Sequence, residues 1–295
     1  MSNPSRNEDF YRFRIGQFEC VSVSDGYYEY DPGHLFVGLK DAQFSALLKS
    51  YDLPTDRIVS PYSFLYVDTG KHKVLADMGA GTLGPHTGNM VKNLKIAGIQ
   101  PRDIDTIVIT HAHPDHIGGT LDAKGKPNFP NALYYLWKDE WDFWFSEEAF
   151  SKVEEHLSGV LPTEVFMKIA HEQLLPIRER ITLLLEESEI VPGVFSHKAY
   201  GHTPGHMVVS FSSAGEELFF TSDTVVFPFL LERLDLVPVF DMNPDMANVS
   251  KHRIFNLAAE RHALVHAQHF MPFPSLGHVL KKERGWQWIP LSPDN

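Results

Sequence analysis

The apolar pattern in the first third of the chain predicts short strands and then a helix. β-type runs occupy four segments: 13–15, 20–23, 63–67 and 73–77. The turn-like Asp68-Thr69-Gly70 separates the last two. Apolar residues then recur at helical spacing over 87–97, and Gly98 follows them. The continuous apolar run 106–110 comes next, so the pattern predicts that a helix leads into a buried strand.

Downstream segments keep alternating between the two patterns. Further β-type runs occupy 132–136, 194–200, 208–211, 218–221 and 263–265, and the segment 208–221 has the pattern of a hairpin. Helical patterns cover 244–260 and a segment from Lys138 to about His156 that is rich in aromatic residues, Phe150 among them. We expect these aromatics to pack in the core, with Trp141 or Trp144 in the wall of a substrate pocket as the alternative. This mixture predicts an α/β layered sandwich.

The organisation of the chain favours a single domain over residues 1–295. No Gly/Ser-rich or Pro-rich linker and no short repeat divides it. The segment 27–61 separates two groups of strands and contains a predicted short helix, 41–48, with Asp41 as its cap. We interpret this segment as an insertion over the core. It is a candidate lid for an active site and a candidate contact in a homodimer.

Composition narrows the class of protein. The chain has 295 residues, 43% hydrophobic and 22% charged, which is typical of a globular protein. Its net charge of -12 disfavours a nucleic-acid partner. The single cysteine, Cys20, excludes an internal disulfide framework, a Cys-rich zinc module and an iron–sulfur cluster. Without an apolar leader or a span of about 20 apolar residues, we expect a soluble, cytoplasmic protein with no membrane partner.

The candidate chemistry lies in the 16 histidines, several of which cluster. Thr110-His111-Ala112-His113-Pro114-Asp115-His116-Ile117-Gly118-Gly119 directly follows the predicted buried strand. Imidazole nitrogen and carboxylate oxygen are ligands that divalent first-row metals accept when no thiolate is offered. Pro114 redirects the chain, so that two histidines face one point while Asp115 and His116 face a second. This spacing suits two metals better than one. A solvated turn rich in histidine is the structural alternative.

Three later segments offer further ligands. Gly201-His202-Thr203-Pro204-Gly205-His206 follows a predicted strand, and its glycines allow close approach of the backbone. Phe219-Phe220-Thr221-Ser222-Asp223 ends in an acid that would bridge two cations, although such an acid is commonly a helix cap. Leu264-Val265-His266-Ala267-Gln268-His269-Phe270 delivers two histidines, of which one is needed.

Together these segments resemble the metallo-β-lactamase superfamily. Its signature is a His-x-His-x-Asp-His loop, a distant Gly-His-Thr-x-Gly-His, an Asp at a strand end and a final His, and all occur here in that order. Leu75-Ala76-Asp77-Met78-Gly79 is similar to the family's early Asp-Thr-Gly. Residues 88–119 and 269–278 look most like the branch that contains methyl parathion hydrolase and related lactonases. The resemblance implies a four-layer αββα sandwich.

The resemblance also implies a set of metal ligands. His111, His113 and His202 would hold one divalent ion, while Asp115, His116 and His269 hold the other and Asp223 bridges them. It favours His202 over His206, which is then an outer or structural residue. It favours His269 over His266, although the extra residue Met271 in the tail departs from the family's pattern. Asp77 would orient a ligand histidine. Zinc is the expected metal, with iron, manganese and cobalt as alternatives.

The expected activity is that of a metal-dependent hydrolase. Two cations would ionise a water molecule for attack on an ester-like bond, with Asp115 or Asp223 taking the proton. A lactone of the acyl-homoserine type is the first substrate class, because Phe227, Phe229 and Leu230 suggest an apolar pocket. Hydrolysis of organophosphate triesters or thioesters and iron-dependent redox chemistry are alternatives. A metal-binding protein without enzymatic activity is an alternative of a different functional class. Lactonases of this superfamily carry a tyrosine where this chain has Val226, so another group or the metals must stabilise the oxyanion.

Overall fold

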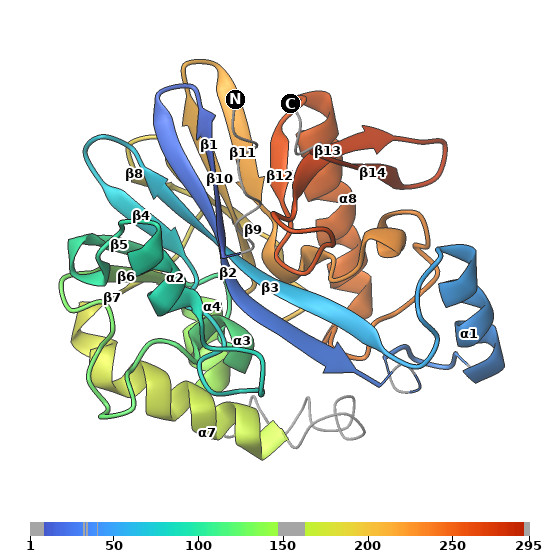
Figure 1. Ribbon diagram of the computed structural model, residues 1–295, viewed down its shortest axis with the longest axis horizontal. Coiled ribbons are helices and arrows are strands. Elements are labelled where there is room, and N and C mark those ends of the chain that lie inside the picture. Colours follow the sequence, from blue (N-terminus) through green and yellow to red (C-terminus); the bar gives the residue numbers. More distant parts are fainter. Residues whose placement is uncertain (1–8, 32, 34, 40, 147–162, 292–295) are drawn as a thin grey trace.

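The computed structural model describes residues 9–31, 33, 35–39, 41–146 and 163–291, and two seven-stranded sheets organise them (Figure 1). In the first sheet the strands follow the order of the sequence. They are β1 (Phe10–Ile15), β2 (Phe18–Tyr30), β3 (Ile58–Asp68), β4 (Lys73–Ala76), β5 (Thr106–Val108), β6 (Leu133–Trp137) and β7 (Ile181–Leu184). Strands β1 to β4 pair antiparallel, and β4 to β7 pair in parallel.

The second sheet has the order β14-β13-β12-β11-β10-β9-β8. Its strands are β8 (Glu189–Val191), β9 (Val194–Lys198), β10 (Met207–Ser213), β11 (Glu216–Phe220), β12 (Leu264–His266), β13 (Leu276–Lys281) and β14 (Trp286–Pro290). Only the β11–β12 pair is parallel. The predicted hairpin is confirmed as β10–β11.

The helices within the described residues are α1 (Asp41–Ser50), α2 (Met90–Ile96), α3 (Pro114–Ile117), α4 (Lys138–Trp144), α7 (Thr163–Leu174) and α8 (Pro244–Glu260). Of these, α2, α4, α7 and α8 pack against the outer faces of the two sheets. Short 3-10 turns are η2 (Pro101–Asp103), η3 (Leu175–Arg180), η4 (Ser222–Thr224) and η5 (Pro228–Leu231). In Figure 1, α2 and α7 lie at the lower left and α8 at the right, with strands between them.

Three apolar cores define four layers. One core lies between the sheets and joins residues such as Val67 and Phe211. A second lies between the first sheet and helices α2, α4 and α7, where Leu94 and Trp144 are fully buried. The third lies between the second sheet and α8, around Phe255. Removal of this apolar surface from water is the main force that holds helices on both faces. The α/β four-layer αββα sandwich is confirmed.

Several element bounds differ from the predictions. Strands β2 and β3 extend to Tyr30 and from Ile58, so both ends of the segment 27–61 are strand. Eleven residue pairs hold these strands together across a bulge at Asp25, and this pairing extends strand structure over polar positions. The helix predicted from residue 138 is α4 and ends at Trp144, while its remainder, with Phe150 and His156, falls largely outside the described residues.

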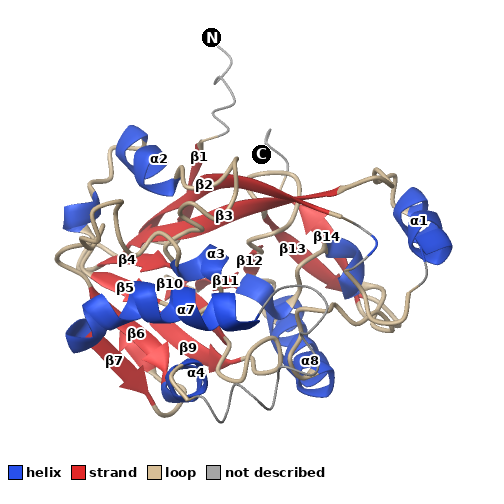
Figure 2. Ribbon diagram, turned by 90° about the horizontal axis from the view of Figure 1, so that it is seen from below, coloured by secondary structure: helices blue, strands red, loops and turns tan. Residues whose placement is uncertain are grey.

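The chain connections gather polar side chains at one end of both sheets. Asp77 follows β4 and the His111 segment follows β5, and these two strands are parallel. In the second sheet, Asp223 follows β11 and His269 follows β12, which are also parallel. Carboxyl ends of neighbouring parallel strands share one edge, so all these segments meet there. Figure 2 shows α3 at the middle of the molecule with strands of both sheets around it.

None of the helices within the described residues is long and apolar enough to span a bilayer.

Candidate metal centre

The histidine loop crosses from β5 to α3 in a conformation that its sequence favours. His113 is extended (φ -68°, ψ 151°) and precedes Pro114, which occupies the first helical turn, where its missing N–H is no loss. The backbone N–H of Met78 donates to the carbonyl of His116 at 2.8 Å. Gly119 packs so closely that an added Cβ would lie 2.1 Å from the Met78 carbonyl oxygen. The loop is therefore held against the segment after β4.

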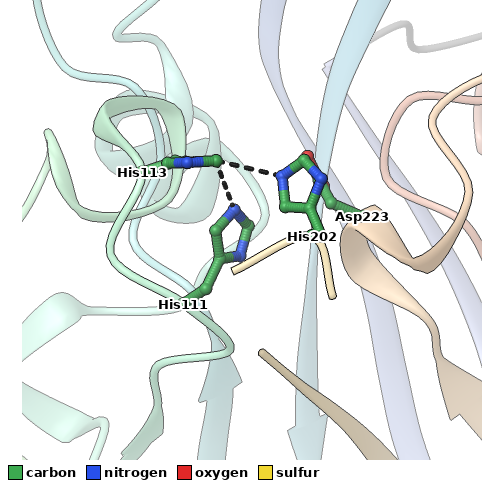
Figure 3. Close-up of side chains that lie close together, drawn as sticks. All are labelled: His111, His113, His202 and Asp223. Carbon is green, nitrogen blue, oxygen red and sulfur yellow. Dashed lines mark hydrogen bonds and ion pairs between the residues drawn. The ribbon is translucent and has the colours of Figure 1, made fainter. Parts of the chain in front are cut away.

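The first group of potential ligand atoms belongs to His111, His113, His202 and Asp223 (Figure 3). All four atoms lie within 4.8 Å of one another. Nε2 of His111 and Nε2 of His202 each lie 3.0 Å from Nδ1 of His113. Oδ2 of Asp223 lies 3.2 Å from Nε2 of His202. Three imidazole nitrogens and a carboxylate oxygen thus converge from three separate segments.

The second group joins Asp115, His116 and His269 to the same Asp223, again within 4.8 Å. Oδ1 of Asp223 lies 3.2 Å from Nε2 of His116 and 3.1 Å from Nε2 of His269. Oδ2 of Asp115 lies 3.6 Å and 3.5 Å from the same two nitrogens. Because Asp223 turns one oxygen toward each group, it lies between them, as a bridging ligand would.

Outer partners fix three of these imidazoles. Nδ1 of His116 lies 2.8 Å from Oδ2 of Asp77, which also accepts a hydrogen bond from the Thr110 hydroxyl. Nδ1 of His202 lies 3.0 Å from Oδ1 of Asp241. Nδ1 of His269 lies 3.0 Å from the hydroxyl of Ser60. Asp77 thus contacts a candidate ligand, as expected, whereas Asp241 and Ser60 carry no signal in the sequence.

The donor set fits divalent cations. A neutral imidazole has one N–H, and where Nδ1 carries it toward an outer carboxylate, the lone pair of Nε2 faces the group. Such lone pairs 3.0 Å apart repel one another unless a cation or proton lies between them. Oδ1 of Asp223 is buried and accepts no hydrogen bond of good geometry from the described residues. A buried carboxylate oxygen in this position calls for a positive charge.

Burial and the neighbouring charged groups together set the pKa values of the cluster. Burial holds the pKa values of His111 and His113 well below the usual range. For His202, burial lowers the pKa, but the nearby carboxylates of Asp223 and Asp241 outweigh it and raise the pKa to about 9. The pKa of Asp223 lies well below its usual range because the neighbouring histidines outweigh its burial. Cation binding must therefore displace protons from the cluster.

Glu140 is a buried acid that the sequence reasoning missed. Its Oε1 accepts hydrogen bonds from the N–H of Ala112 at 2.9 Å and the indole N–H of Trp144 at 2.6 Å. Its Oε2 accepts from the hydroxyl of Thr203 at 2.6 Å and the N–H of Gly205 at 2.9 Å. The carboxylate therefore ties both histidine loops to α4. The sequence does contain a signal for Glu140: it lies four residues before Trp144, and this spacing places an acid on the apolar face of the helix.

The glycines of the second histidine loop allow close approach, as expected. An added Cβ on Gly205 would lie 2.2 Å from the backbone nitrogen of Glu140. An added Cβ on Gly201 would lie 2.0 Å from that of Ala247 in α8. Only glycine permits the loop to pack against both helices at these positions.

Two other histidines take structural positions. Nδ1 of His206 lies 3.0 Å from the Ala199 carbonyl, and Nε2 accepts a hydrogen bond from the N–H of Asp223. His266 lies within β12, and its Nε2 contacts the Ser22 hydroxyl at 2.9 Å. Burial lowers the pKa of each to about 3. Neither belongs to the two ligand groups, in agreement with the choice of His202 and His269.

A cavity of about 410 Å³ opens onto both groups. Its apolar lining is Leu35, Leu83, Phe166, Val226, Phe227 and Phe240. Phe227 lies in the wall as expected, but the prediction was wrong for Phe229 and Leu230. Both side chains are buried in an apolar core, where Phe229 stacks on Phe227 and packs against Phe36 and Tyr51. Trp141 and Trp144 do not line the cavity either and pack in the core of the first sheet.

A comparison with protein families settles the superfamily. Residues 57–269 match the metallo-beta-lactamase superfamily. The chain belongs to this superfamily. The resemblance in the histidine motifs is therefore confirmed at this level, while the branch that contains methyl parathion hydrolase stays a prediction.

Several relatives of this superfamily member are hydrolases. The crystal structure of hydrolase AbOPH is 27% identical with a TM-score of 0.88, and the match covers 98% of this chain and 99% of that one. AidC, a dizinc quorum-quenching lactonase, is 28% identical with a TM-score of 0.85, covering 97% and 98%. A metal-dependent hydrolase of Bacillus licheniformis is 35% identical over 85 residues, or 26% of this chain and 32% of that protein. The chain thus spans about a third of this last relative, and the set supports a metal-dependent hydrolase.

Proposed function

We propose that this protein is a dinuclear metal-dependent hydrolase that opens an ester-like bond in a neutral, largely apolar small molecule. A lactone of the acyl-homoserine type is the first substrate class. The observation that carries the proposal is the pair of ligand groups that share Asp223 beneath one cavity. The likeness to AidC, a dizinc lactonase, supports the same substrate class.

The chain's own residues supply orientation and proton transfer. Two divalent cations, with zinc as the first choice, would supply Lewis acidity and lower the pKa of a water molecule. Asp77, Asp241 and Ser60 hold three of the imidazoles in fixed orientations, so the site is organised before substrate arrives.

Asp115 is the better placed of the two acids to move a proton. Both oxygens of Asp223 lie within 3.2 Å of histidine nitrogens. In Asp115 only Oδ2 lies near histidine nitrogens of the described residues, at 3.6 Å and 3.5 Å, and the side chain is 14% exposed at the cavity. Asp115 can therefore accept the proton that water loses and return it to the leaving oxygen.

The charge of the cavity wall favours neutral substrates. Neither lysine nor arginine occurs among the described residues that line it, whereas Glu29 and Asp31 do. The net charge of the chain is also -12. A substrate with a free carboxylate, such as a β-lactam or a glutathione thioester, would meet no cationic side chain there. An uncharged lactone or phosphotriester avoids this repulsion.

A hydrolysis panel tests the proposal. Protein of measured metal content is assayed with acyl-homoserine lactones, aryl phosphotriesters, thioesters and β-lactams. We expect kcat/KM for a neutral lactone to exceed that for an anionic β-lactam by roughly 100-fold, because like-charge repulsion costs several kcal/mol. Activity confined to phosphotriesters would move the substrate to that class, and no activity on any ester-like compound would contradict the proposal.

Two measurements separate the remaining alternatives. Metal content well below one ion per chain after gentle purification would favour a protein without catalytic activity. Oxygen uptake that depends on added iron would favour a redox enzyme, since imidazole and carboxylate ligands also suit iron.

A further inference from the structure

Two tyrosine hydroxyls form a hydrogen-bonded pair in the cavity. The hydroxyl oxygens of Tyr30 and Tyr62 lie 2.9 Å apart. Both residues line the cavity together with Asp115, Asp223 and His269. Tyr30 ends β2 and Tyr62 lies on the adjacent β3. The ring of Tyr62 also packs edge-on against His269 with a centroid distance of 5.1 Å, so the pair stands beside the second ligand group.

The pair holds one proton more than its own hydrogen bond uses. Two hydroxyls carry two protons, and one bond between them engages one. Among the described residues, neither hydroxyl has another hydrogen-bond partner. Tyr62 is only 1% exposed, whereas Tyr30 is half-buried. If Tyr62 donates to Tyr30, the Tyr30 proton is free for a molecule in the cavity.

Both hydroxyls are protonated at physiological pH, because a tyrosine phenol has an ordinary pKa of about 10. No lysine or arginine lies among the described residues that line the cavity around them. The pair is therefore a hydrogen-bond donor at physiological pH rather than a base.

We propose that Tyr30 donates a hydrogen bond to the substrate oxygen that gains negative charge during attack, and that Tyr62 is a positioning residue that orients the Tyr30 hydroxyl. This inference rests on the proposed function. No proton is transferred: Tyr62 donates to Tyr30, and Tyr30 donates to the oxyanion. The nearby Val226, which also lines the cavity, carries no donor.

Conservative substitutions test the pair. Tyr30→Phe and Tyr62→Phe are compared with Tyr66→Phe, a buried tyrosine on the same strand β3 that does not line the cavity. With zinc content equal in all four proteins, we expect Tyr30→Phe to lower kcat for a lactone by about 10- to 100-fold with little change in KM. Tyr62→Phe should lower kcat by a smaller factor, and Tyr66→Phe should match the wild type. An unchanged kcat in Tyr30→Phe would overturn the inference.

A binding measurement gives a readout that does not depend on turnover. The γ-lactam analogue of N-hexanoyl-homoserine lactone, which is neutral and has a ring amide in place of the ester, is titrated while the near-ultraviolet tyrosine absorption is recorded. We expect a difference spectrum in the wild type and in Tyr66→Phe that Tyr30→Phe loses. No binding, or binding without that spectrum, would overturn the inference. If the spectrum appears but no ester-like substrate is hydrolysed, the proposed function fails while the donor pair is supported.

Discussion

Glu140 is a single residue on which the relative position of both histidine loops depends. Four donors surround its carboxylate, one from the first histidine loop, two from the second and one from α4 itself, and none of them is a cation. Burial raises its pKa, while hydrogen bonds from Thr203 and Ala112 act in the opposite direction. A buried acid is costly unless its hydrogen bonds are all made. Because Glu140 bonds to both metal-ligand loops, it positions them before any ion binds.

Glu140→Gln should weaken both the fold and the metal centre. A glutamine keeps only one acceptor oxygen, so its NH2 group would face two of the four donors, where an acceptor is needed. We expect a loss of about 1–3 kcal/mol in the free energy of unfolding of the metal-free protein, measured with urea. Zinc affinity should fall by about 10- to 100-fold in a competition titration.

Asp142→Asn is the matched control for Glu140→Gln. It lies on the same helix, and its side chain is 52% exposed in an ion pair with Lys138. It should leave stability within about 0.5 kcal/mol and zinc affinity unchanged. Equal behaviour of the two variants would contradict a positioning role for Glu140.

Variants of the two histidines in the last motif, His266 and His269, should differ in their metal content. His269→Ala removes a candidate ligand, so we expect elemental analysis to show about one ion per chain in place of about two. His266→Ala should keep the wild-type metal content and lower the free energy of unfolding by about 2 kcal/mol, because it empties a buried site and leaves Ser22 without that partner. Loss of metal in His266→Ala alone would reverse the assignment.

At the scale of elements, the bulge in β2 connects the sheet to the segment before α2. Asp25 occupies the bulge and accepts hydrogen bonds from the N–H of Ala80 at 2.9 Å and of Met90 at 2.7 Å. The same segment contains Asp77 and Met78, which contact His116. Burial raises the pKa of Asp25 to about 6, although these hydrogen bonds lower it.

This shift predicts a pH dependence of stability. Because the pKa is about 6 in the folded state and near 3.8 when unfolded, the native protein binds more protons between these values. The contribution of Asp25 to stability is therefore fully present below about pH 3.8 and is lost as pH rises through about 6. Relative to Asp25→Asn, the wild type should lose about 2 kcal/mol of unfolding free energy between pH 4 and pH 7. A difference that does not change with pH would contradict this prediction.

Elements with strong local signals were predicted well. Helix α8 begins and ends at the predicted residues, since Asn243 caps it by accepting from the N–H of Met246 and Pro244 follows at the first turn. Strands β2 and β3 were predicted too short because polar residues such as Ser24 and Ser60 interrupt the apolar pattern. In the sheet Ser24 pairs with Ser63 and Ser60 pairs with Tyr28, and no local pattern records such pairing of remote positions.

At the scale of the whole molecule, bound metal should contribute to stability. The candidate ligands come from four segments far apart in the sequence, so cations that bind them favour the folded chain alone. An ion present at 1,000 times its Kd adds about 4 kcal/mol, which for a chain of this size is roughly 10 °C in Tm. Calorimetry before and after chelation should show this decrease, and added zinc should reverse it. An unchanged Tm would count against a metal centre formed by distant segments.

The homodimer, the lid role of the segment 27–61 and the cytoplasmic location stay predictions. Light scattering at micromolar protein concentration measures the mass of the particle in solution and so tests the homodimer. A monomer mass at that concentration would contradict the homodimer.

The sequence alone determined the kinds of ligand, their order along the chain and the layered α/β class. It did so because strand ends, helix caps and clustered histidines are local patterns. Tertiary structure decided which of two neighbouring histidines reaches the site: His266 is held within β12 beside Ser22, while His269 lies beyond the strand end and faces Asp223. It also brought Glu140, Asp241 and the Tyr30–Tyr62 pair to the site. Their roles depend on the pairing of remote strands and the packing of helices, which single segments do not encode.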